Sequence, residues 1–321
     1  MLRTSKHSML PRSSRIFTLV VFVLSLLLIT GAAQNPGTDR SIHPQSPHRK
    51  QHNIASGLNL YSESMETKLG NQVALQFENS ATIIADPATE IYLKQIIHGL
   101  LLDPEVRAPS VVKIVFDMDV NAYAFPGHLY VNTGLLLVAQ NEAELAGAIA
   151  HELAHLSARH GTKGLTRQRL WSAPWLPLCG VGLCESSVFK HLSTFTTSFP
   201  LRKYERGAEY EADRLAVEYV FRSGYDPEAL ADLLERLPYK NRKRPPFLKR
   251  VLETHPYVDR RVQRIRAAAD KLSQDPIYIL DTHDFQEMKG HMARRVQQEI
   301  STRRDHRSDC KNPHLQERCD H

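Results

Sequence analysis

NEAELAGAIAHELAHLSARH, residues 141–160, is a run of small and apolar residues with polar side chains at its start and in its second half. Asn141 is followed three residues later by Glu144, which is the capping-box arrangement that begins an α-helix. The apolar pattern then continues, and Gly161 is a residue type that commonly ends a helix. The sequence therefore predicts one mostly buried helix from Asn141 to about His160.

This helix carries a short motif of three polar side chains, His151-Glu152-Leu153-Ala154-His155. Histidines four residues apart stand on one helical face about 6 Å apart, so both rings can bind one Zn²⁺ ion. Glu152 is rotated by about 100° from His151, which leaves it able to contact a water molecule at the metal. The alternative is a helix with two satisfied or surface histidines. It is disfavoured because an apolar helix would then bury three costly polar groups for no gain.

A catalytic zinc site needs a third protein ligand and one open coordination position. The metzincin pattern would require glycine at position 158 and histidine at position 161. The sequence has Ala158 and Gly161 instead, which excludes that subclass. Farther along the chain, Glu209 and Asp213 lie four residues apart on one face of a predicted helix. We expect Glu209 to bind the metal and Asp213 to accept the free ring N–H of a ligating histidine.

Two alternatives remain for the segment around Glu209. Its other charged side chains, from Glu205 to Arg214, also suit a solvated helix face. Glu211 is a rival metal ligand, although it lies about 200° round the helix from Glu209 and has no carboxylate four residues after it.

The flanking sequence contains further helical patterns and a few strand-like runs. Apolar residues at helical spacing predict helices over 62–77, 87–102, 133–140, 201–222, 226–237, 256–272 and 284–303. β-rich runs at 111–116, 121–125 and 129–131 predict a small sheet of two or three strands, and 277–280 predicts one more short strand. The fold class that we expect is therefore α+β and mainly helical, with the small sheet packed on the helix of residues 141–160.

The chain of 321 residues has an ordinary globular composition, with 42% hydrophobic and 24% charged residues. Its formal net charge is +6, but four positive charges lie before residue 34, so the remainder carries only +2. That balance is too small to hold nucleic acid by neutralising phosphates, and we expect no nucleic-acid partner.

The first residues look like an export signal. A basic segment precedes a short apolar run at 16–29, and the small residues Gly31-Ala32-Ala33 follow. We expect a signal peptide over 1–33 that is cleaved after Ala33, with an uncleaved membrane anchor as the alternative. We expect residues 34–57 to form a flexible leader, residues 58–290 to form one catalytic domain, and residues 291–321 to form the end of a helix and a polar tail.

The cysteines form two close pairs, which suits an oxidising compartment: Cys179 with Cys184, and Cys310 with Cys319. We expect disulfides within these pairs, with idle thiols as the alternative. A zinc site at the second pair must also be weighed, because three histidines surround it: His306, His314 and His321. The spacings match no common zinc pattern, so the metal interpretation is disfavoured.

Five motifs occur in order along the chain: NAYAFPG (121–127), YVNTGL (130–135), NEAELAGAIAHELAH (141–155), EYEAD (209–213) and SGYDP (223–227). Together they resemble the HtpX and CAAX-prenyl-protease family of zinc metallopeptidases, over about residues 58–290. More narrowly, they resemble its exported bacterial members, which act on misfolded or misassembled envelope proteins. The chain departs from relatives of this kind in two respects. We expect no multi-span membrane region, and residues 291–321 show no tetratricopeptide pattern.

The resemblance implies one zinc ion per chain, bound by His151, His155 and Glu209, with Glu152 as the general base and Asp213 behind a ligand. The expected reaction is hydrolysis of peptide bonds in unfolded or misassembled polypeptides in the periplasm. The alternative function is a zinc-stabilised chaperone or assembly factor with little proteolysis. A membrane-embedded prenyl protease is disfavoured because no apolar run after residue 29 approaches 18 residues. Residues 171–184 could at most associate with a bilayer surface.

Two further segments have open interpretations. The strand from Asn121 to Phe125 is either an ordinary core strand or an edge to which an extended substrate adds. The resemblance extends to Thr254-His255-Pro256, where His255 either caps the following helix, occupies the open zinc position at rest, or donates to the oxyanion. We favour the resting-state plug, because the loop from 240 to 253 could lift it away. The residues 259–261, Asp-Arg-Arg, are expected to form a surface turn.

Overall fold

The computed structural model describes residues 57–101, 106–172, 205–237, 255, 258–272 and 277–309. The expected signal peptide, nearly all of the leader, the four cysteines and the loop from 240 to 253 lie outside these residues, and their predictions stand as predictions. In the part of the chain that is described, no helix combines the length and the apolar character needed to cross a membrane.

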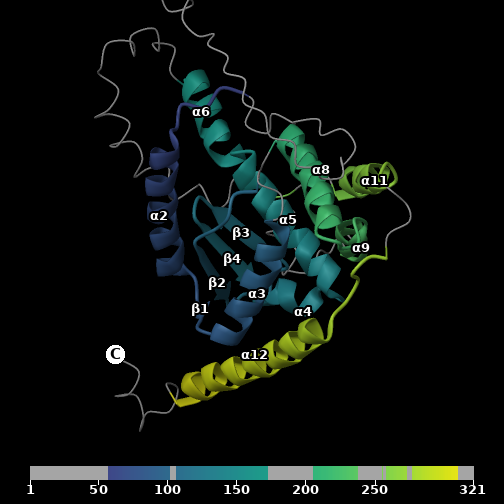
Figure 1. The fold of residues 1–321 in the computed structure, drawn as a ribbon. Coiled ribbons are helices and arrows are strands. Elements are labelled where there is room, and N and C mark those ends of the chain that lie inside the picture. The colour runs from purple at the N-terminus through teal and green to yellow at the C-terminus, as the bar shows by residue number, and fades with distance from the viewer. Residues whose placement is uncertain are drawn as a thin grey trace, which may run out of the picture. The chain divides into compact units, whose positions relative to one another are not determined.

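Helices make up most of the described chain (Figure 1). Their bounds are α2 (Glu63–Ser80), α3 (Pro87–Leu100), α4 (Thr133–Val138), α5 (Glu142–Ser157), α6 (His160–Ser172), α8 (Arg206–Arg222), α9 (Ala229–Arg236), α11 (Val258–Ala269) and α12 (His283–Asp309). Every helix expected from the apolar spacing is present with shifted ends, and α6 is an addition. The strand expected at 277–280 is wrong, because this segment makes only an isolated bridge between Ile279 and Tyr225.

The sheet has four strands, where two or three were expected: β1 (Ile83–Ile84), β2 (Val111–Val115), β3 (Ala122–Phe125) and β4 (His128–Asn132). Their spatial order is β1-β2-β4-β3. β2 and β4 are parallel, whereas β1 and β3 are antiparallel to their neighbours. β1 is only two residues long, too short for a periodic pattern to reveal it. The mainly helical α+β class is confirmed, and β3 lies at one edge of this sheet.

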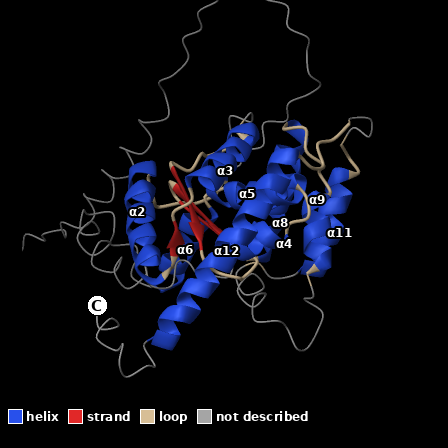
Figure 2. Cartoon of the chain, turned by 90° about the horizontal axis from the view of Figure 1, so that it is seen from below, coloured by secondary structure: helices blue, strands red, loops and turns tan. Residues whose placement is uncertain are grey.

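The sheet lies between helices on both faces, as Figure 2 shows with α2 on one side and the other core helices opposite. Alternate residues of β3 point to opposite faces, as a pleated strand requires. Tyr123 and Phe125 pack on Phe77 of α2 in an aromatic cluster. Ala122 and Ala124 instead belong to the larger core that contains α5. These small side chains are compatible with a close approach of α5 to β3.

Helix α5 packs against β3, α8 and α9, and most of its residues are buried. Its start is as predicted, because the Asn141 side chain accepts a hydrogen bond of 2.9 Å from the backbone N–H of Glu144. The Glu144 carboxylate accepts a hydrogen bond from the backbone N–H of Gln140, whereas in a complete capping box it would accept from the backbone N–H of Asn141. Gly147 allows α9 to come close, since a Cβ there would lie 3.0 Å from the Cβ of Leu230.

The predicted end of this helix is wrong. α5 ends at Ser157, and the chain turns at Arg159, whose φ of 58° lies in the left-handed region that side chains other than glycine rarely adopt. A new helix, α6, then begins at His160. The Arg159 side chain stabilises this turn, because its Nε donates to the buried carboxylate of Glu66 at 2.8 Å. His160 therefore begins a second helix instead of ending the first.

Candidate metal centre

Four buried side chains bring potential ligand atoms to within 4.8 Å of one another: His151, His155, Glu209 and His255. Helices α5 and α8, which lie side by side, provide the first three (Figure 1). The two Nε2 atoms of His151 and His155 are 3.0 Å apart. Glu209 Oε1 lies 3.5 Å from His155 Nε2, and Glu209 Oε2 lies 3.7 Å from His151 Nε2. The three expected ligands are thus adjacent.

The chemistry of these groups fits a cation. Glu209 is fully buried, and its Oε2 atom accepts no hydrogen bond from the described residues. Glu209 and Asp213 are two buried carboxylates that share the guanidinium of Arg261, which lies 3.1 Å from Glu209 Oε2, so a cation at the cluster would compensate the remaining negative charge. Burial, followed by the neighbouring histidines, lowers the pKa of His155 well below its usual value. A neutral imidazole is the form that binds a metal.

Asp213 lies where the helical spacing predicted, next to the ring of His151. Its Oδ1 is 3.0 Å from His151 Nδ1. Burial opposes ionisation, but Arg261 and His151 outweigh it and lower the pKa of Asp213 to about 2. A carboxylate at this nitrogen holds the ring proton on Nδ1, which leaves a lone pair on Nε2 directed at the cluster.

Arg261 is a buried member of the site that the sequence interpretation missed. It was expected in a surface turn, but its side chain is only 2% exposed. Its Nη1 lies 3.1 Å from Glu209 Oε2, and its Nη2 lies 2.7 Å from Asp213 Oδ1. A signal was present in the spacing: Arg261 follows Val258 by three residues and precedes Ile265 by four, so it shares their buried face of α11.

Glu152 lies beside the cluster rather than in it. Its Oε1 is 3.3 Å from His255 Nε2, and the residue is buried. Burial raises the pKa of Glu152, although the positive charges of His255 and His151 would lower it. A carboxyl group of this kind can take up and release a proton next to a metal site.

His255 is brought into the cluster from the chain before α11. Its Nδ1 lies 3.1 Å from Glu209 Oε1 and 3.4 Å from His151 Nε2. The ring is therefore close enough to occupy a coordination position beside the other three side chains. Burial opposes protonation, but Glu209 and Glu152 raise the pKa of His255.

Glu211, the rival ligand, does not belong to the cluster of four. Its Oε2 lies instead 3.1 Å from Nε2 of His160. The helical geometry that set Glu211 about 200° from Glu209 is therefore the reason why it faces a different partner.

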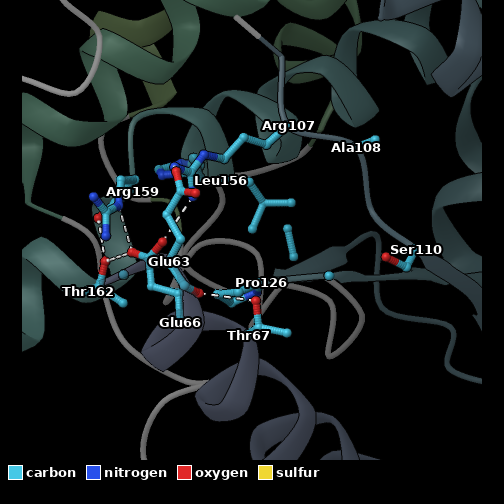
Figure 3. Close-up of a pocket in the computed structure, with 14 residues that line it drawn as sticks. Glu63, Glu66, Thr67, Arg107, Ala108, Ser110, Pro126, Leu156, Arg159 and Thr162 are labelled. Atoms are coloured by element: carbon cyan, nitrogen blue, oxygen red, sulfur yellow. Dashed lines mark hydrogen bonds and ion pairs between the residues drawn. The ribbon is translucent and has the colours of Figure 1, made fainter. Parts of the chain in front are cut away.

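Two cavities adjoin the cluster. One of about 420 Å³ is lined by residues of α2, the β3–β4 turn and the α5–α6 junction, including His155. Figure 3 shows Arg107 and Arg159 directed toward the carboxylates of Glu63 and Glu66 in this cavity. The other, of about 50 Å³, lies between the start of β3 and α9 and is mostly apolar; it is lined in part by His151, Glu152, Leu230, Leu233 and Leu234.

Comparison with known proteins finds several relatives that are named as proteases. The beta-barrel assembly-enhancing protease of Yersinia pestis is 27% identical over 282 residues, which are 84% of this chain and 57% of that protein. The one of Escherichia coli (strain K12) is 28% identical over 236 residues, 70% of this chain and 47% of that protein. Metalloprotease LoiP of the same strain is 26% identical over 221 residues, 67% of this chain and 84% of LoiP. The chain spans about half the length of the two assembly-enhancing proteases.

The family resemblance expected from the five motifs is confirmed. The model of peptidase family M48 matches residues 87–269, which is more than half of the chain and includes all four members of the buried cluster. This chain therefore belongs to peptidase family M48.

Proposed function

We propose that this chain is a zinc-dependent endopeptidase in which His151, His155 and Glu209 bind one zinc ion and Glu152 is the general base. The observation that carries the proposal is the convergence of buried imidazole and carboxylate atoms within 4.8 Å, with a buried glutamate alongside. Two histidines and one glutamate are a common ligand set for catalytic zinc. Membership of a peptidase family supports the same reaction.

The chemistry follows from the positions of these groups. When bound, zinc supplies Lewis-acid polarisation of the scissile carbonyl and lowers the pKa of water to about 7. Glu152 takes a proton from the attacking water and later returns it to the leaving amine. Asp213 and Arg261 hold His151 and Glu209 in place. Asp213 contacts Nδ1 of His151, the ring nitrogen that does not face the ligand cluster, and Arg261 contacts Oε2 of Glu209.

We propose further that an extended substrate adds to the free edge of β3. Asn121 C=O accepts from Asn132 N–H, so Asn121 and Asn132 form a hydrogen-bonded pair. Such pairs alternate along an antiparallel ladder, which directs the backbone groups of Ala122 and Ala124 away from β4. No other described strand pairs with β3 on that side. Backbone pairing of this kind tolerates many sequences and suits a protease of unfolded chains.

The resting state of the site is proposed to include His255 as a plug. Its ring lies within reach of Glu209, His151 and Glu152. In that position it would fill the coordination site that a substrate carbonyl must enter. Activation then requires displacement of His255.

The proposed biological role is quality control of exported proteins. The basic leader and apolar run at the N-terminus support export, and the curated relatives carry the name of beta-barrel assembly-enhancing protease. We therefore propose a periplasmic location and misfolded or misassembled envelope polypeptides as substrates. N-terminal sequencing of the exported protein tests the location: a start near Gln34 is expected, and a start at Met1 in the membrane fraction would favour the anchor.

Cleavage of an unfolded test protein decides the reaction. Zinc-loaded wild type is expected to cleave β-casein, whereas Glu152→Gln should retain its zinc and lose turnover. Glu299→Gln is the matched control, because Glu299 pairs with Arg303 on α12 away from the cluster. A zinc-loaded wild type that suppresses aggregation but cleaves nothing would contradict the proposal and favour the chaperone alternative.

A further inference from the structure

His155 differs from His151 in the partner of its second ring nitrogen. Nδ1 of His151 faces the carboxylate of Asp213, but Nδ1 of His155 lies 2.9 Å from Nδ1 of a third histidine, His160. The two rings are steeply inclined, with an interplanar angle of 71°. Both are buried. A histidine that binds a metal normally needs a group that fixes its tautomer and ring orientation.

The break between α5 and α6 is what allows this contact. In a continuous helix, a residue five positions after His155 would point about 140° away from it. The left-handed turn at Arg159 ends α5, so His160 starts a new helix and its ring returns to His155. Since Glu66 binds the Arg159 side chain, the unusual backbone conformation is held by an ion pair between a partly buried arginine and a buried carboxylate.

Glu211 completes the chain of contacts. Its Oε2 lies 3.1 Å from Nε2 of His160, within hydrogen-bonding distance. The Glu211 side chain is 35% exposed, whereas that of His160 is 5% exposed. The contacts therefore lead from Glu211, a partly exposed residue of α8, through His160 to the buried ring of His155.

We propose that His160 and Glu211 are positioning residues for His155, an inference that rests on the proposed zinc site. A carboxylate oxygen accepts a hydrogen bond from a ring N–H, so the contact of Glu211 Oε2 with His160 Nε2 places the His160 proton on Nε2. In that tautomer His160 has a lone pair on Nδ1, so the proton between the two rings belongs to Nδ1 of His155. This assignment leaves the lone pair of His155 on Nε2, which is the atom 3.0 Å from His151 Nε2 and 3.5 Å from Glu209.

Zinc affinity of the purified full chain tests the proposal, measured by competition with a chromogenic chelator. His160→Ala should weaken zinc binding by about 10- to 100-fold, as removal of such partners typically does. Glu211→Ala should weaken it in the same direction, and Glu211→Gln should restore part of the loss because its amide oxygen can still accept from His160 Nε2–H. Glu218→Ala is the matched control, since Glu218 lies on α8 and pairs with Arg214.

A double variant separates positioning from general loss of structure. Because Glu211 acts through His160, His160→Ala combined with Glu211→Ala should bind zinc no more weakly than His160→Ala alone. Thermal unfolding of the zinc-free proteins checks that each variant is folded. If His160→Ala fails to fold, the comparison of Glu211→Ala with Glu211→Gln carries the test, because Glu211 is partly exposed.

The outcomes distinguish this inference from the proposed function. Wild-type affinity in folded His160→Ala, or in Glu211→Ala when only that variant folds, would overturn the inference alone. Fully additive losses in the double variant would also overturn it. A wild-type chain that binds no zinc would overturn the proposed metal site and the inference with it.

Discussion

Replacing Arg261 with methionine should lower the free energy of unfolding of the zinc-free protein by about 3–5 kcal/mol. The guanidinium is 2% exposed and contacts two buried carboxylates at 2.7 and 3.1 Å. Methionine retains much of the side-chain volume but none of the charge. Glu209 and Asp213 would then lie buried without their positive partner, which is the costly arrangement when one member of a buried pair is removed.

Zinc should recover more stability in this variant than in the wild type. In the wild type, Arg261 already compensates Glu209, and its charge opposes the approach of a cation. In Arg261→Met that opposition is absent, so the zinc-dependent gain in unfolding free energy should be larger. A ligand that binds only the folded state stabilises it according to its affinity and concentration, which makes the gain measurable.

Urea unfolding with a chelator and with excess zinc measures both effects. Arg266→Met is the control, because Arg266 lies on the same helix but is 36% exposed and binds its acidic partners at the surface. Exposed ion pairs contribute about 0–1 kcal/mol, so this variant should change little. A loss below about 1 kcal/mol in zinc-free Arg261→Met would refute the view that Arg261 compensates buried charge.

Three other outcomes are expected. Glu209→Ala should lose most of its zinc by metal analysis while Glu152→Gln keeps it, and full zinc content in Glu209→Ala would contradict the ligand assignment. His255→Ala should raise basal proteolysis if the residue is a plug, whereas a fall of about 10²-fold in kcat would indicate an oxyanion donor; unchanged rates and zinc affinity would leave only a structural role. At Asp86, burial is outweighed by bonds from Thr89 N–H and His291, which lower the pKa of the carboxyl. Its contribution to stability is therefore present above about pH 4 and is lost as the pH falls further, so Asp86→Asn should show a shallower loss of stability below about pH 4 in acid unfolding; identical slopes would count against this contribution.

The parts of the site that lie within single helices could be predicted from spacing alone. His151 and His155 share a face of α5, and Glu209 and Asp213 share a face of α8, because residues four apart always do. The structure adds only that the two helices are neighbours. The family motifs had already implied that pairing, which is why the three expected ligands meet.

The parts that were missed depend on events that spacing does not encode. The turn at Arg159 uses a left-handed conformation without the glycine that usually marks it, so α6 was not expected. β1 is too short for a periodic signal. Arg261 follows two other charged residues and looks exposed, although its register with Val258 and Ile265 places it on the buried face. A polar residue that shares a helix face with apolar residues is therefore a signal of a buried polar contact, just as an apolar residue there is a signal of the core.

Helix α8 contributes Glu209 to the proposed ligands and also the carboxylates that face the second nitrogens of His151 and, through His160, of His155. These three acids occupy alternate positions of one short segment, 209, 211 and 213. Glu209 and Asp213 share the buried face of α8. Glu211 lies about 200° round the helix from Glu209, at the edge of that face. The orientation of both imidazoles is consequently set by one helix–helix interface, and small buried residues on each side, such as Ala150, Ala154, Ala212 and Ala216, are consistent with a close approach of α5 and α8. A change in the separation or rotation of α8 would move Glu209, Glu211 and Asp213 together, so the arrangement of the proposed ligands depends on the packing of these two helices.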